Sequence, residues 1–91
     1  MKIRTNGKSM LPTLTEGSIY DVIEVPITEL HVGDIVVFYE HNMVICHRII
    51  KIVKTGSGMV FYKTKGDNCS QADAVALTYD NILGKIQLCD A

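Results

Sequence analysis

The chain has 91 residues, an apolar content of 47% and a formal net charge of −1. This length suits one domain, and the apolar content is sufficient for a hydrophobic core, which excludes a disordered chain. The lysines and arginines are scattered, so the chain lacks the basic patch of a protein that binds nucleic acid or an anionic membrane surface. We therefore expect a single domain spanning residues 1–91.

Runs of β-branched and aromatic residues, separated by glycine, proline and asparagine, predict a series of short strands. Between these strands, Leu30 and Val32 are expected to be buried, and His41-Asn42 is expected to form a tight hairpin turn. The predicted strands are residues 3–5, 18–25, 34–40, 43–54, 59–65 and 82–88.

The run at 43–54 is the longest strand candidate. Side chains alternate along a strand, so one face is expected to carry Val44, Cys46, Arg48, Ile50 and Ile52. The opposite face is expected to carry Ile45, His47, Ile49, Lys51 and Val53. Both faces are mainly apolar near the middle, which predicts a strand in the interior of the sheet.

The last third of the chain has a weaker pattern. Gly66-Asp67-Asn68 interrupts the strands, and residues 72–77 predict a helical turn. Gly84, inside the last strand, predicts a bulge or a close approach of two backbones. Together the elements predict an all-β domain, either a small, partly open barrel or a folded sheet.

The cysteines and the apolar runs also limit the function. Cys46, Cys69 and Cys89 form an odd, widely spaced set, which favours a reducing compartment and gives no zinc-ligand spacing. No apolar run reaches the roughly 20 residues that cross a bilayer, and residues 1–7 have no apolar core behind them, so we do not expect them to be a secretory signal. We expect a cytoplasmic protein if the chain is complete, and a membrane-anchored one if it is part of a longer protein.

A few polar residues stand out against this apolar pattern. Ser9 lies in a proline-braced loop beside Gly7, which can adopt backbone angles closed to other residues. His47 lies in mid-strand on a largely apolar face, and Asp67 and Asp73 follow the returning strand. A serine, a histidine and an aspartate that are distant in sequence form the set that a proton-relay hydrolase assembles in space.

Five motifs carry a resemblance to a known family. They are SMLPTL (9–14), GDIVVF (33–38), HRIIKI (47–52), KGDN (65–68) and ILGKI (82–86). In this order they resemble the motifs of the type I signal peptidase superfamily, which also includes the self-cleaving SOS repressors. The resemblance covers the chain from Gly7 to about Leu88. It implies an all-β serine endopeptidase that cleaves a signal or leader peptide from a precursor protein, with no metal or other cofactor.

The resemblance also implies roles for single residues. Ser9 corresponds to the nucleophile, and its backbone N–H to a donor of the oxyanion hole. His47 corresponds to the general base, where most of the superfamily has lysine, so the chain is similar to the histidine-base, endoplasmic-reticulum type. A histidine suits this role because an imidazole with a pKa of about 6.5 is largely neutral at pH 7. A lysine would first have to lose its charge through burial.

The partner of the histidine is less well defined by the motifs. The family places an aspartate several residues after its GDN turn, and Asp73 is the nearest match. The spacing from Asp67 is one residue shorter than in the histidine-type enzymes, and Ala74 occupies the strict position. Asp67 is therefore the alternative, and a serine–histidine dyad is the third possibility.

Two departures from the family pattern and the two neighbours of the histidine complete the expectations. Gly7 replaces a serine that assists the oxyanion hole in many signal peptidases, and losing one such donor typically costs on the order of 100- to 1000-fold in rate. Gly7 and the Asp73 spacing motivate the alternative function, a non-catalytic peptide-binding module with the same fold.

Arg48 points away from His47 and is expected to be structural, bonding carbonyls or a carboxylate. Strand alternation separates Cys46 from His47, which argues against a cysteine nucleophile.

Overall fold

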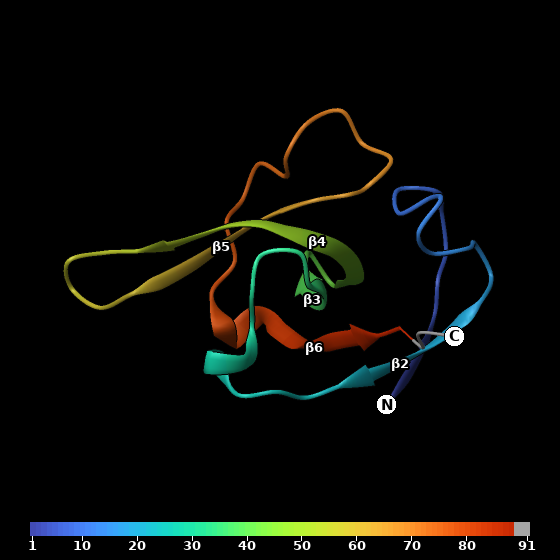
Figure 1. Ribbon diagram of the computed structural model, residues 1–91. Helices are drawn as coiled ribbons and strands as arrows, with labels where there is room; N and C mark the ends of the chain where they lie inside the picture. Colours follow the sequence, from blue (N-terminus) through green and yellow to red (C-terminus); the bar gives the residue numbers. More distant parts are fainter. Residues whose placement is uncertain (89–91) are drawn as a thin grey trace.

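The computed structural model describes residues 1–88 and consists of one antiparallel six-stranded sheet (Figure 1). The strand order is β1-β2-β6-β3-β4-β5, so β1 and β5 are its edges. The all-β prediction is confirmed, as a curled sheet that does not close into a barrel. The strands are β1 (Lys2–Arg4), β2 (Ile19–Ile23), β3 (Ile35–Glu40), β4 (Met43–Lys54), β5 (Val60–Lys65) and β6 (Ile82–Gln87), with 3-10 turns η1 (Ile27–Glu29) and η2 (Tyr79–Asn81).

Strand β3 forms the centre of the core because both of its faces are covered. Its residues alternate between two apolar clusters, which explains the unbroken apolar run in the sequence. The first cluster contains Met10, Leu14, Val22, Ile35, Val37 and Ile86. The second cluster contains Leu30, Val36, Phe38, Ile49, Tyr62 and Leu77.

Strand β4 is paired on both sides, as predicted, but its alternation is broken by a bulge. The β4–β5 register shifts between Ile49 and Lys51, which leaves Ile50 as an extra, exposed residue. Ile52 therefore packs against the same cluster as Ile49. The prediction that Ile52 lies on the face of Cys46 is wrong, since a period of two holds only along an unbroken ladder.

The glycine and hairpin predictions fit the backbone. His41 and Asn42 have φ values of +50° and +62°, as a tight two-residue hairpin requires. A Cβ on Gly84 would lie 2.5 Å from the Ile23 carbonyl oxygen, and the β3–β6 register shifts beside it. Gly84 thus marks both a close backbone approach and a bulge.

Of three predictions about the connecting segments, one is confirmed and two are wrong. Leu30 is buried, as predicted, but Val32 is 60% exposed because it lies in the turn that the His31 carbonyl closes. The helical turn predicted at 72–77 is wrong. Leu77 instead exchanges two backbone hydrogen bonds with Tyr62 of β5, both of 2.8 Å, and the helical turn follows as η2.

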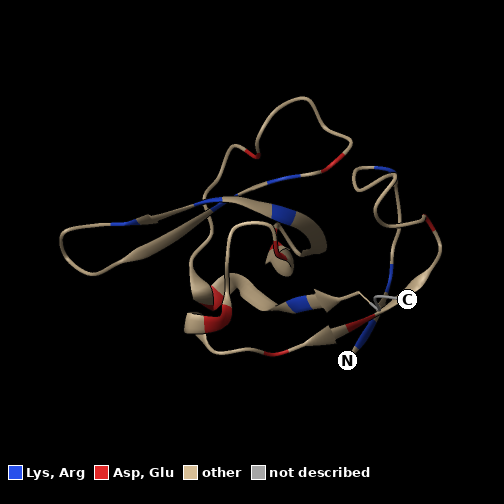
Figure 2. Ribbon diagram, viewed as in Figure 1, with Lys and Arg blue, Asp and Glu red and all other residues tan. Residues whose placement is uncertain are grey.

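The remaining global features concern charge and membranes. Figure 2 shows that the charged residues are spread over the strands and loops and do not gather on one side. Within residues 1–88, no helix has the length and apolar character needed to cross a membrane. Cys89 lies outside the described residues.

Candidate active site

The loop between β1 and β2 presents Ser9 from a firmly anchored backbone. The side chains that flank the serine, Met10 and Leu14, are 5% and 2% exposed and fill the first core cluster. Gly7 has a φ of +95°, a conformation that favours glycine. The Ser9 carbonyl accepts a 2.7 Å hydrogen bond from the backbone N–H of Asn68. The loop is thus tied both to the core and to the turn that follows β5.

His47, on β4, lies between the serine and an aspartate. Its Nε2 is 3.2 Å from Ser9 Oγ, and its Nδ1 is 2.6 Å from Asp73 Oδ2. The side chain is only 12% exposed and lies edge-on to the ring of Phe38, with a centroid separation of 6.1 Å. An Nδ1–H that donates to Asp73 leaves the lone pair of Nε2 directed at the serine hydroxyl.

Strand β5 fixes the position of Asp73. The fully buried Thr64 donates its hydroxyl hydrogen to Asp73 Oδ2 over 2.6 Å. The backbone N–H of Asp73 donates to the Thr64 carbonyl over 2.8 Å. Two hydrogen bonds to one residue therefore determine where the carboxylate lies and which oxygen it offers to His47.

Asp67 lies in a different network, on the other face of β4. Arg48 donates to both of its carboxylate oxygens, Nε to Oδ1 over 2.8 Å and Nη2 to Oδ2 over 2.7 Å. Arg48 also donates to the Gly33 carbonyl over 2.6 Å, and the Thr13 hydroxyl donates to Asp67 Oδ2. Arg48 thus lies on the face that the alternation predicted, and it bonds a carboxylate and a carbonyl, as expected for a structural role. The hydrogen bonds from Arg48 lower the pKa of Asp67 to about 2.

The low pKa of Asp67 predicts a pH-dependent contribution to stability. The ordinary aspartate pKa is about 3.9, so the ion pair stabilises the fold fully above that value and is lost as pH falls towards about 2. We expect Asp67→Asn to lower the free energy of unfolding at pH 7 by about 1–3 kcal/mol. Urea unfolding should show that the difference from wild type shrinks between about pH 4 and pH 2.

Asp21→Asn is the matched control for this measurement. Asp21 pairs with Lys2 at the exposed edge of the sheet, where both side chains are more than half exposed. Its loss is therefore expected to change stability far less than the loss of Asp67. A constant gap between Asp67→Asn and wild type over the whole acid range would contradict the assignment.

Sequence reasoning did not single out three further residues at the site, Gly66, Thr64 and Asn68. A Cβ on Gly66 would lie 2.7 Å from the Ser9 carbonyl oxygen and 3.2 Å from His47 Nε2. Gly66 and Asn68 belong to the KGDN motif, which pointed to the turn without giving their contacts. Thr64 could have been identified from the sequence, because it is a polar residue on the same buried face of β5 as Tyr62, two residues earlier.

The close approach of Gly66 to the Ser9 backbone and the His47 ring leads to a second prediction. Gly66→Ala is expected to displace the Ser9 backbone or the His47 ring by a few tenths of an ångström or more, and to lower any peptidase activity by on the order of 100-fold. Steady-state kinetics would measure the loss. Gly56→Ala is the control, because an added Cβ there contacts nothing within 4 Å. Equal activity of Gly66→Ala and wild type would contradict the tight fit.

A groove of about 500 Å³ runs past Ser9 and His47, between residues 3–9 and the start of β4. In β4, only residues from Arg48 onward pair with β5, so residues 43–47 have an open backbone edge. Such an edge can accept an extended peptide as an added strand.

Cys46 and Cys69 are free thiols close to this arrangement: Cys46 lines the groove, and Cys69 Sγ would lie 2.8 Å from a Cβ on Gly66. Cys46 packs against the first core cluster, and burial raises the pKa of its thiol. Within the part of the chain that the structure describes, no three His, Cys, Asp or Glu side chains gather closely enough to hold a metal ion.

Comparison with known proteins finds one informative similarity. The chain is 38% identical over 76 residues to signal peptidase I W of Bacillus subtilis (strain 168). The matched region covers 81% of this chain and 40% of that protein. No protein-family model and no solved structure matches the chain. The similarity supports the type I signal peptidase family, and the chain corresponds to less than half the length of this relative.

Proposed function

We propose that the chain is a serine endopeptidase domain of the signal peptidase type, spanning residues 1–91, with Ser9 as nucleophile and His47 as general base. The observation that carries the proposal is the position of the His47 ring. One of its nitrogens is 3.2 Å from a serine hydroxyl, and the other is 2.6 Å from an aspartate carboxylate. The similarity to a signal peptidase I supports the same reading. The histidine in place of a lysine would assign the chain to the histidine-base branch.

The first half of the proposed reaction forms an acyl-enzyme. Ser9 Oγ attacks the scissile carbonyl carbon while its proton passes to His47 Nε2. The resulting imidazolium is stabilised by the negative charge of Asp73. The developing oxyanion accepts a hydrogen bond from the Ser9 backbone N–H, which has no acceptor among the described residues. His47 then gives its proton to the leaving amine, and the C–N bond breaks.

The second half releases the acyl product. A water molecule transfers a proton to His47 Nε2 and attacks the ester carbon. Collapse of this second tetrahedral intermediate returns the proton to Ser9 Oγ and frees the new carboxyl terminus. Every proton transfer runs through one nitrogen atom, so the chemistry requires the Nδ1–H tautomer that Asp73 favours.

The groove supports a peptide substrate. An extended chain beside the open edge of residues 43–47 would bring its carbonyl groups past Ser9. The proposed substrate is therefore a signal or leader peptide in extended conformation, joined to its precursor protein. Neither a metal ion nor another cofactor takes part in the proposed steps.

A digest of a diverse peptide library, read by mass spectrometry, tests the proposal. Wild-type protein should release new termini at a common sequence pattern, and Ser9→Ala should release none. No cleavage by folded wild-type protein in detergent micelles or vesicles, combined with saturable peptide binding, would favour the peptide-binding module. Cleavage that survives in Ser9→Ala would overturn the proposal.

Thr64 provides a prediction about the support of the site. Thr64→Val removes the hydroxyl that bonds Asp73 but keeps the shape of the side chain. We expect kcat to fall by about 10- to 100-fold, because the carboxylate loses one of the hydrogen bonds that position it. Thr64→Ser, which keeps the hydroxyl, should recover most of the activity. Equal losses in both variants would indicate a packing defect and contradict the positioning role.

A further inference from the structure

The KGDN turn (residues 65–68) lies beside the Ser9 loop, as Figure 1 shows, and Asn68 joins the two segments by two hydrogen bonds. Its backbone N–H donates to the Ser9 carbonyl over 2.7 Å. Its side-chain amide Nδ2 donates to the Lys8 carbonyl over 3.0 Å. The side chain of Asn68 therefore contacts the peptide group that directly precedes the serine.

The Lys8 carbonyl and the Ser9 N–H belong to one peptide group, which is trans. A trans peptide group is planar, so its C=O and N–H bonds point in opposite directions. A donor that fixes the direction of the Lys8 carbonyl therefore also fixes the direction of the Ser9 N–H. Only the amide nitrogen of Asn68 suits this contact, because a carbonyl oxygen can accept a hydrogen bond but cannot donate one.

The Ser9 N–H is available on the side of the loop that faces the groove. The groove past Ser9 and His47 is lined by the loop itself and by β4, and by none of residues 65–68. The Ser9 N–H, opposite to the carbonyl that Asn68 contacts, has no acceptor among the described residues. Gly7 cannot take its place, because it has no side-chain donor and its own N–H donates to Glu16 Oε2 over 3.1 Å.

We propose that Asn68 is a positioning residue that aims the Ser9 N–H into the groove, where the oxyanion would form. Its effect on rate rests on the proposed function, whereas the contact itself does not. An aimed donor matters most in the transition state, because the charge on the oxygen develops only there. The Leu11 N–H also donates to the Lys8 carbonyl, over 3.2 Å, so loss of the Asn68 amide would loosen this peptide group without freeing it.

Kinetics of Asn68→Ala test the effect on rate. The variant keeps the backbone bond to Ser9, and kcat for a peptide identified in the library digest should fall by about tenfold while KM stays within about twofold. A peptide aldehyde of the same sequence should also bind about tenfold more weakly, because its adduct with Ser9 places an oxygen at the oxyanion position.

Asn81→Ala is the matched control for these measurements. Asn81 is also an exposed asparagine with a side-chain hydrogen bond, but its partner is Thr78 in the turn η2. The control should change neither kcat nor the affinity for the aldehyde. Wild-type kcat in Asn68→Ala, a loss that falls on KM alone, or unchanged binding of the aldehyde would each overturn the positioning role.

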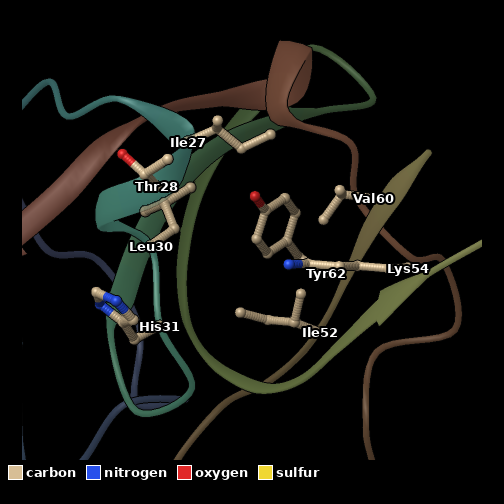
Figure 3. Close-up of a pocket in the computed structure, with 8 residues that line it drawn as sticks. All are labelled: Ile27, Thr28, Leu30, His31, Ile52, Lys54, Val60 and Tyr62. Carbon is tan, nitrogen blue, oxygen red and sulfur yellow. The ribbon is translucent and has the colours of Figure 1, made fainter. Parts of the chain in front are cut away.

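An NMR measurement tests the contact without any activity. In Asn68→Ala the ¹⁵N resonance of Ser9 should shift more than that of Gly7, because only the Ser9 nitrogen shares a peptide group with the Lys8 carbonyl. The amides around the separate pocket between η1 and the β4–β5 hairpin (Figure 3), such as that of Leu30, are the reference and should not move.

The two measurements distinguish a failure of this inference from a failure of the proposed function. Equal shifts of Ser9 and Gly7, or no shift of either, would overturn the inference even if the wild-type protein cleaves peptides. A Ser9 shift in a protein whose wild type cleaves no peptide would refute the proposed function, and it would still support Asn68 as the residue that directs the Ser9 N–H.

Discussion

Ser9→Ala and His47→Ala are each expected to lower kcat/KM for peptide cleavage by on the order of 10⁴- to 10⁶-fold. Ser9 Oγ is the only atom at this site that can form the proposed ester. Among residues 1–88, His47 Nε2, 3.2 Å away, is the ring nitrogen placed to accept its proton. The two residues act as one unit, so the double variant should be no slower than the slower single variant. Initial rates with a peptide identified in the library digest would measure this non-additivity.

Two conservative replacements control for effects on folding. Ser70→Ala changes an exposed serine without a side-chain hydrogen bond among residues 1–88, and should leave the rate unchanged. His41→Asn changes an exposed histidine at a φ of +50°, a conformation that asparagine tolerates. Thermal unfolding of all variants shows whether each remains folded. Multiplicative losses in the double variant would mean that Ser9 and His47 do not share one proton transfer.

The fold could be predicted from local patterns where the ladders are regular. Residues 43–54 became one strand with the predicted bounds, and the His41-Asn42 turn joins it to β3. The pattern failed where a single extra residue intervened. Nothing in the run of isoleucines and lysines marks Ile50 as the bulge, because the shift is set by the register of the partner strand.

The segment 69–81 could not be predicted because its structure depends on distant contacts. Leu77 is extended through backbone pairing with Tyr62, and the intervening loop follows from the contact of Asp73 with β5. Local helix propensity at 72–77 is too weak to compete with a buried bridge. Propensities describe the chain alone, whereas this loop is shaped by the strand beside it.

The positions of the site residues also depend on contacts between distant parts of the chain, which limited what the sequence alone could predict about the site. The sequence favoured Asp73 over Asp67 as the partner of His47, with Asp67 as the alternative, but it could not give the position of either carboxylate, since residue spacing does not give the path of a loop. In the structure, the Thr64 carbonyl receives the Asp73 N–H, which brings Asp73 to the His47 side of β4. Alternation did predict Arg48 on the opposite face, where it binds Asp67.

Asp73→Asn is therefore expected to lower kcat by on the order of 10⁴-fold. The change removes the negative charge that stabilises the imidazolium form of His47. An amide nitrogen facing Nδ1 would also favour the wrong tautomer, with the hydrogen on Nε2, and that nitrogen could not accept the Ser9 proton. KM should change little, because the carboxylate faces His47 and Thr64 and does not line the serine groove.

Asp67→Asn is the matched comparison, since it makes the same chemical change six residues earlier in the sequence. It removes the charge opposite Arg48 and leaves the His47–Asp73 contact in place, so its effect should fall mainly on stability. At a temperature where both variants are folded, kcat of Asp67→Asn should exceed that of Asp73→Asn by at least 100-fold. The reverse order would make Asp67 the functional partner. Near-wild-type rates in both variants would leave a serine–histidine dyad, with Asp73 only a structural ligand of Thr64.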